Sequence, residues 1–193
     1  MVIRNKIAGI DYSLTSPSLC IFTGGNIDDF NNFEFFNLNS SKSDIQHLNT
    51  FNNIQAHLHS DNYFDFIERY DIISDFFIDK LNLFKVKDVV IEGYSFGSSG
   101  SRLFQLVENT AVLKYKIRKG GFNLSIVPPT TVKKFFTGSG RAGKELMYES
   151  FLDNTGVDIA KTIKKRSNSP YSDIVDSYAI CLYNLKQKNE KKN

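Results

Sequence analysis

The chain has 193 residues, of which 41% are hydrophobic, and a formal net charge of +3. This length suits one core, so we expect a single domain over residues 1–187, with a polar insertion around 39–61 and a basic flexible tail over 188–193. No run of about 18 apolar residues and no signal-like leader is present, so we expect a cytoplasmic protein with no membrane partner. Cys20 and Cys181 lie in apolar runs without metal-ligand spacing, which favours buried free thiols over a disulfide or a zinc site.

The first part of the chain predicts a three-stranded antiparallel meander. The apolar runs "IAGID" and "SLCIF" are typical of strands, and "TGGN" supplies glycines for a hairpin turn before a third strand, "FEFFNL". The stretch 39–61 is rich in Asn, Ser and His and has little periodicity, so it predicts a surface insertion with room for a short helical piece. We expect two of its histidines, His57 and His59, to be exposed to solvent.

The remaining elements alternate between helices and strands. Apolar residues at helical spacing predict an amphipathic helix over 62–84, and the β-branched run "KDVVIEGYS" predicts a strand buried on both faces. A helix over 102–119, a strand at "FNLSIV", two helices around "PPTTVKKFF" and "KELMYESFL", and a last helix over 172–187 with Ser172 as its N-cap follow. This order predicts an α/β fold with a mixed five-stranded sheet, an antiparallel meander followed by parallel strands, and flanking helices.

Four acidic residues stand where this topology can bring them together. Asp11 and Glu92 each end a predicted strand, and Asp173 and Asp176 share one face at the start of the last helix. Each also has an ordinary explanation, because a strand-end Asp caps turns and acids are favoured in a first helical turn. If the four converge, their repulsion calls for protonation or a multivalent cation. Oxygen ligands without His or Cys favour Mg²⁺ or Mn²⁺, and two such ions support phosphodiester hydrolysis.

Basic residues are concentrated in the second half of the chain. A basic face can hold a polyanion, although a solvated helical surface explains any one of these side chains equally well. The candidates for contact with nucleic acid are Arg102, Lys134, Arg141, Lys164, Lys165 and Arg166.

Four segments, in this order, resemble the RuvC family of Holliday-junction resolvases, which have the ribonuclease H-like fold: "GIDYSLTSPS", "VVIEGYSFG", "VPPTTVKKFFTGSGRAGKELM" and "SDIVDSYAI". The resemblance implies that Asp11, Glu92, Asp173 and Asp176 are the catalytic, metal-binding carboxylates. It also implies two Mg²⁺ ions per active site, with Mn²⁺ able to substitute, and four-way DNA junctions as substrate.

The resemblance implies further roles. Lys133 and Lys144 match basic positions near the scissile phosphate, where a cation stabilises negative charge, although Lys144 as a plain surface lysine remains an alternative. The family uses an aromatic side chain after the second acid to stack on bases at the junction, and Tyr94 and Phe96 are both candidates. Relatives act as homodimers, and we expect the partner contact on the helix from Arg102 onward.

The chain also departs from the family pattern. Tyr12 stands where Pro is usual, "TSPS" replaces a common Thr-Gly step, and the insertion is longer than in compact bacterial relatives. Neither substitution removes a candidate ligand. Abundant Asn, Phe, Lys and Ile are typical of an AT-rich phage or viral genome, which would place the protein in a host cytoplasm. Viral relatives often cut several branched DNA forms.

The leading hypothesis is therefore a metal-dependent endonuclease of DNA recombination and repair that resolves four-way and related branched DNA, a crossover junction endodeoxyribonuclease. A ribonuclease that acts on RNA-DNA hybrids and a non-catalytic module that binds branched DNA are the alternatives. An actin-like ATPase shares the "GID" motif with its Ser/Thr turn, but needs a second glycine-rich phosphate hairpin and a longer chain than this one.

Overall fold

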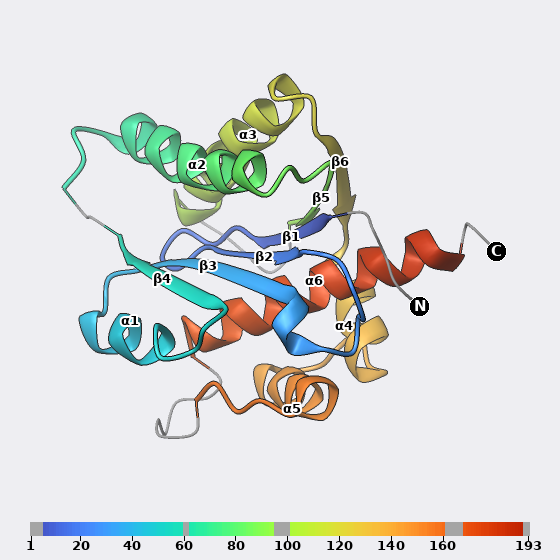
Figure 1. Ribbon diagram of the computed structural model, residues 1–193. Coiled ribbons are helices and arrows are strands. Elements are labelled where there is room, and N and C mark those ends of the chain that lie inside the picture. The colour runs from blue at the N-terminus through green and yellow to red at the C-terminus, as the bar shows by residue number, and fades with distance from the viewer. Residues whose placement is uncertain (1–5, 60–61, 95–100, 161–167, 191–193) are drawn as a thin grey trace.

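The computed structural model describes residues 6–59, 62–94, 101–160 and 168–190, and its centre is a six-stranded mixed sheet (Figure 1). The strand order is β4-β3-β2-β1-β5-β6. The β1, β2 and β3 strands form the expected antiparallel meander, while β4 pairs parallel to β3, β5 to β1 and β6 to β5. The strands are β1 (Ile7–Asp11), β2 (Ser18–Phe22), β3 (Phe33–Asn39), β4 (Ile54–Leu58), β5 (Asp88–Glu92) and β6 (Asn123–Val127).

Helices cover both faces of the sheet (Figure 1). The pair α2 and α3 lies on one face, and α1, α4, α5 and α6 lie on the other, so that each face has its own hydrophobic cluster. Within the part of the chain that is described, no helix is both long and apolar enough to cross a membrane. The helices are α1 (Lys42–Leu48), α2 (Phe66–Leu83), α3 (Ser101–Lys119), α4 (Pro129–Thr137), α5 (Lys144–Thr155) and α6 (Tyr171–Glu190), with a short 3₁₀ turn, η1 (Phe30–Asn32).

The expected surface insertion contributes a sixth strand, so the prediction of five strands was one too few. Within it, α1 is capped by Ser41, and β4 extends the sheet beyond β3. Ile54 and Ala56 of β4 face the core, with exposures of 2% and 4%. Alternating apolar side chains bury one face of this edge strand, and that period of two was hidden among polar neighbours.

The prediction that His57 and His59 are exposed to solvent was wrong. His59 is 4% exposed, and its Nδ1 atom lies 2.8 Å from the hydroxyl of Tyr63. His57 is half-buried, with its ring centroid 5.2 Å from that of Phe76 on α2. His57 is covered by Phe76 of α2, and His59 is covered by Tyr63 and by Arg69 of α2, whose Nη2 atom lies 3.3 Å from His59 Nε2.

The last helix begins one residue earlier than predicted, and Ser172 is not its N-cap. The backbone N–H of Ser172 donates to the carbonyl of Asn168, and that of Ile174 donates to the carbonyl of Pro170. Ser172 therefore lies inside the first turn of α6, where its side chain is buried. Its hydroxyl is thus free of the capping role and available for contacts with other side chains.

The α6 helix packs closely against β1. Ile174 and Tyr178 on α6 are buried, and the thiol of Cys181 donates to the carbonyl of Ile7 over 3.5 Å. Cys20 and Cys181 are both buried and free, which confirms their predicted state. This packing brings the start of α6 to the edge of the sheet at which β1 and β5 both end.

A glycine makes the close approach of β1 and α6 possible. A Cβ atom on Gly9 would lie 2.3 Å from the backbone nitrogen of Cys181 and 2.7 Å from the carbonyl oxygen of Ser177. Both neighbours are backbone atoms of a helix, so they cannot move aside as a flexible side chain would. Gly9 therefore sets the distance between the strand that carries Asp11 and the helix that carries Asp173.

We expect Gly9→Ala to lower the free energy of unfolding by at least about 1–3 kcal/mol, because the added methyl group must push α6 away from β1. Denaturant titration followed by circular dichroism measures the change. Gly93→Ala is the matched control, since a Cβ there meets its nearest neighbours at 3.4 Å, an ordinary contact distance. Equal stability of Gly9→Ala and the wild type would contradict the close packing described here.

Candidate active site

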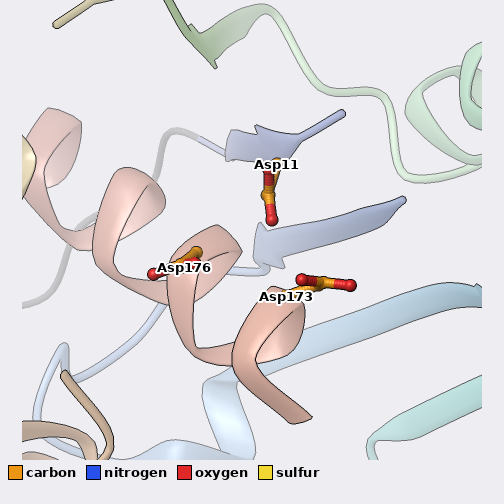
Figure 2. Close-up of side chains that lie close together, drawn as sticks. All are labelled: Asp11, Asp173 and Asp176. Atoms are coloured by element: carbon orange, nitrogen blue, oxygen red, sulfur yellow. The ribbon is translucent and has the colours of Figure 1, made fainter. Parts of the chain in front are cut away.

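Three aspartates converge where β1 ends beside the start of α6. Asp11 is the last residue of β1, and Asp173 and Asp176 lie one turn apart on α6 (Figure 2). Each offers a carboxylate oxygen, and these oxygens all lie within 4.8 Å of one another. Asp173 is buried, while Asp11 and Asp176 are half-buried. The arrangement places three negative groups in a space that a single cation could occupy.

One local and one tertiary feature bring these acids together. The i,i+3 spacing puts Asp173 and Asp176 on the same face of α6. The hydroxyls of Ser18 on β2 and Ser177 on α6 lie 3.1 Å apart in the core, next to the close approach at Gly9. The helix start is therefore held against the ends of two central strands.

Burial raises the pKa values of all three aspartates, and repulsion by neighbouring acids adds to this at Asp11 and Asp176. Burial, reinforced by the charge of Asp173, raises the pKa of Asp176 to about 7. Burial also raises the pKa of Asp173 to about 6, and burial together with the neighbouring acids raises the pKa of Asp11 well above its usual range. A multivalent cation would relieve this repulsion and let all three ionise, so the donor set fits a hard metal ion such as Mg²⁺.

Glu92 lies beside the three aspartates, at the end of β5. Burial and the charge of Asp176 raise the pKa of Glu92 to about 7, and the charge of Glu92 in turn raises the pKa of Asp11. The group of oxygens within 4.8 Å of one another does not include Glu92. The four acids of the sequence prediction are thus neighbours, with three of them in a tighter cluster.

Two lysines face these acids from α4 and α5. Lys133 lowers the pKa values of Glu92 and Asp176 by its charge. Lys144 is the first residue of α5, and its charge lowers the pKa values of all three aspartates. Both cations are therefore close enough to act on a group held by the acids.

Serine hydroxyls complete the surroundings of Asp173, and sequence reasoning missed their contacts. Ser16, in the turn between β1 and β2, donates from Oγ to Asp173 Oδ2. Ser172 donates from Oγ to Asp173 Oδ1 over 3.2 Å and accepts a hydrogen bond from Lys144 Nζ over 3.1 Å. The Ser/Thr-rich turn after Asp11 was visible in the sequence, but nothing in its pattern indicated a partner 157 residues away.

The candidates for contact with DNA fall into two groups. Tyr94 is 38% exposed, with Lys114 Nζ 4.5 Å from its ring centroid, and Lys134 and Arg141 are exposed. The second group lies outside the described residues: Phe96, Lys164, Lys165, Arg166 and the side chain of Arg102, whose backbone belongs to α3.

The fold is similar to that of solved RuvC structures. RuvC from Thermus thermophilus shares 17% sequence identity with the chain, with a TM-score of 0.63, and the match covers 96% of each chain. RuvC from T. thermophilus in complex with a Holliday junction substrate shares 16% identity, with a TM-score of 0.67, and the match covers 97% of this chain and 96% of that one. No protein-family model and no curated protein sequence matches the chain.

These similarities confirm the predicted fold class. The antiparallel meander followed by parallel strands, with helices on both faces, is the architecture that RuvC shares with this chain over nearly its whole length. At such low sequence identity the likeness concerns the fold alone. The function must be inferred from the side chains at the end of β1 and the start of α6.

Proposed function

We propose that this chain, which has the fold of RuvC, is a metal-dependent endonuclease that cleaves four-way and related branched DNA, a crossover junction endodeoxyribonuclease. The observation that carries the proposal is the cluster of Asp11, Asp173 and Asp176, whose oxygens lie within 4.8 Å of one another on a scaffold of this kind. Buried carboxylates at such distances destabilise the metal-free protein, and a cation-binding role explains them.

The metal ligands in this proposal are Asp11, Glu92, Asp173 and Asp176. Their donor atoms are all carboxylate oxygens, which suits Mg²⁺, with Mn²⁺ as a substitute, better than softer metals. Two bound ions would supply an activated water and stabilisation of the leaving 3′ oxygen during in-line displacement of the phosphodiester. The chain contributes ionised carboxylates held at fixed positions on β1, β5 and α6.

Lys133 and Lys144 complete the proposed catalytic set. A scissile phosphate seated at the acids brings negative charge into a half-buried space. The two ammonium groups, which already act electrostatically on the acids, would offset that charge as it grows in the transition state. This role does not require either lysine to transfer a proton.

The proposed substrate is branched DNA. One of the similar structures is described as a complex with a Holliday junction substrate. The exposed Lys134 lies on α4 and the exposed Arg141 lies in the loop between α4 and α5, and we propose that both contact DNA phosphates. We propose the same role for Arg102, Lys164, Lys165 and Arg166. Tyr94 or Phe96, just after β5, would stack on bases at the junction centre.

We also propose that the enzyme acts as a homodimer, since two symmetric cuts in a four-way junction suit two active sites related by a twofold axis. The α3 helix carries large exposed side chains on its outer face, including Phe104 at 70% and Tyr115 at 63% exposure. Burial of such side chains between two copies is a common reason for their exposure in one chain.

The test is cleavage of a labelled synthetic four-way junction beside a linear duplex and an RNA-DNA hybrid of matched sequence, with Mg²⁺ or EDTA. We expect metal-dependent, paired symmetric nicks in the junction alone. Cleavage of the hybrid only would replace the proposal with a ribonuclease. Salt-sensitive junction binding without cleavage in either Mg²⁺ or Mn²⁺ would indicate a DNA-binding module instead.

A further inference from the structure

Asp173 is the most completely hydrogen-bonded acid of the site. Its Oδ2 atom accepts a hydrogen bond from Ser16 Oγ, and its Oδ1 atom accepts one from Ser172 Oγ over 3.2 Å. All three side chains are buried, with exposures of 2% for Ser16 and 5% each for Ser172 and Asp173. Both oxygens of one carboxylate are therefore held by hydroxyls that come from different parts of the fold.

Ser16 belongs to a turn that is itself fixed from two sides. The Asn37 side-chain amide on β3 donates to the carbonyl oxygens of Ser16 and Pro17, at 3.2 and 3.3 Å. From α2, Arg69 Nη2 donates to the carbonyl oxygen of Leu14 over 2.5 Å. The Ser16 hydroxyl thus contacts Asp173 from a turn that hydrogen bonds hold in place, as expected of a group that orients a ligand.

Ser172 differs because it has a second partner. Its hydroxyl accepts a hydrogen bond from Lys144 Nζ over 3.1 Å while it donates to Asp173. The lysine stands at the first position of α5, and the hydroxyl forms a bridge between its ammonium group and the carboxylate. A lysine side chain at a helix start has several rotatable bonds, so without this acceptor the ammonium group would sample many positions in solvent.

We propose that Ser172 is a positioning residue whose hydroxyl links Lys144 to Asp173 and so holds the lysine's charge at the scissile phosphate. Ser16, in contrast, positions Asp173 alone. The inference rests on the proposed nuclease function and adds to it a division of labour between two serines. Ser172 acts through both Lys144 and Asp173, and the larger part of its contribution, which acts through the lysine, depends on the lysine being present. The contribution of Ser16 does not depend on the lysine.

Single-turnover cleavage of a four-way junction by a double-mutant cycle tests this division. We expect Ser172→Ala to slow cleavage roughly 10- to 100-fold, as loss of a hydrogen bond to charged groups predicts, with junction affinity unchanged. Ser172→Ala should slow cleavage by a much smaller factor when Lys144→Ala is already present, because only its hydrogen bond to Asp173 then remains to be lost. Ser16→Ala should slow cleavage by a similar factor whether or not Lys144 is present.

The controls separate positioning from general damage. Ser74→Ala removes a buried serine on α2, on the opposite face of the sheet from α6, whose hydroxyl donates to the carbonyl of Asp71, so it should leave cleavage nearly unchanged. Ser172→Thr keeps a hydroxyl and should restore most of the rate that Ser172→Ala loses. Ser172→Cys, whose thiol is only a weak donor and acceptor, replaces Ser172→Ala in the comparison if the alanine variant does not fold. If the effects of Ser172→Ala and Lys144→Ala on the cleavage rate are fully additive, the proposed link between the two residues would be overturned.

A measurement without catalysis keeps this inference separate from the proposed function. In NMR spectra of lysine-labelled protein, the ammonium protons of Lys144 should exchange with water more slowly than those of the exposed Lys134. Ser172→Ala should remove this difference. If the ammonium protons of Lys144 exchange as fast as those of Lys134 in the wild type, the proposed link between Lys144 and Ser172 would be overturned even if the protein cleaves junctions. If the exchange of Lys144 is slower than that of Lys134 only when Ser172 is present, the link between Lys144 and Ser172 is supported. If the same wild-type protein cleaves no nucleic acid, the nuclease proposal is overturned.

Discussion

Asp11→Asn is expected to slow metal-dependent junction cleavage on the order of 10³-fold or more while junction binding is retained. The amide keeps the shape of the side chain but removes one negative ligand from a group of three whose oxygens lie within 4.8 Å of one another. Loss of metal stabilisation worth several kcal/mol corresponds to this factor, since each 1.36 kcal/mol changes a rate tenfold. Binding depends instead on contacts between basic side chains and phosphates, which the substitution does not touch.

Cleavage rate and junction affinity, measured on one preparation, check this expectation. Asp79→Asn is the matched control, because Asp79 is an exposed aspartate on α2, on the opposite face of the sheet from α6. That variant should cleave at the wild-type rate. Full-rate cleavage by Asp11→Asn would remove Asp11 from the catalytic set.

The stability of the metal-free protein should depend on pH through the same acids. Burial and repulsion by Asp173 raise the pKa of Asp176 to about 7, and burial with the charge of Asp176 raises that of Glu92 to about 7. In the unfolded chain both groups titrate near pH 4. Between about pH 4 and pH 7 the folded state therefore binds more protons than the unfolded state, so this contribution to stability is present at low pH and is lost as pH rises through 7.

Removal of one of these charges should stabilise the metal-free protein. We expect the Tm of Asp176→Asn in EDTA to exceed that of the wild type by roughly 2–4 °C at about pH 8, the equivalent of about 1 kcal/mol, and the difference to vanish near pH 4. Thermal unfolding over this pH range measures it. A variant less stable than the wild type at pH 8 would show that the carboxylate is not strained by its neighbours.

Divalent metal should reverse this order. If Mg²⁺ binds the ionised acids, as we propose, it should raise the Tm of the wild type more at about pH 8 than at about pH 5, and it should raise that of Asp176→Asn much less. Ca²⁺ is a useful second ion, because it also prefers oxygen ligands. An equal response of the two proteins to Mg²⁺ would indicate that the ion binds elsewhere.

Several elements could be recognised from local pattern alone. The strands that end at Asp11 and Glu92 are short apolar runs followed directly by an acid, and the last helix shows Asp173 and Asp176 at i,i+3 spacing. Such patterns are local because strand and helix periods are properties of consecutive residues. The β4 strand escaped detection because its alternation spans only five residues amid Asn, Ser and His, a length at which periodicity is weak evidence.

Contacts between distant segments could not be read from the sequence. Ser16 and Asp173 are 157 positions apart, and no spacing rule relates a turn near the N-terminus to the first turn of the last helix. Ser172 was interpreted as an N-cap because serine at a helix start usually caps it. The true start of α6 at Tyr171 frees that hydroxyl for Lys144 and Asp173.

Local sequence patterns were sufficient to predict which residues end strands, which acids share a helix face, and that the acids offer oxygen donors without His or Cys beside them. These follow from the backbone periods and from the chemistry of each side chain. The packing of distant segments was needed to show that three of the acids form the tight cluster, that Glu92 lies beside it, and that two serines and Lys144 surround Asp173. Distances between segments depend on packing, and here on the absence of a side chain at Gly9, which lets α6 approach β1.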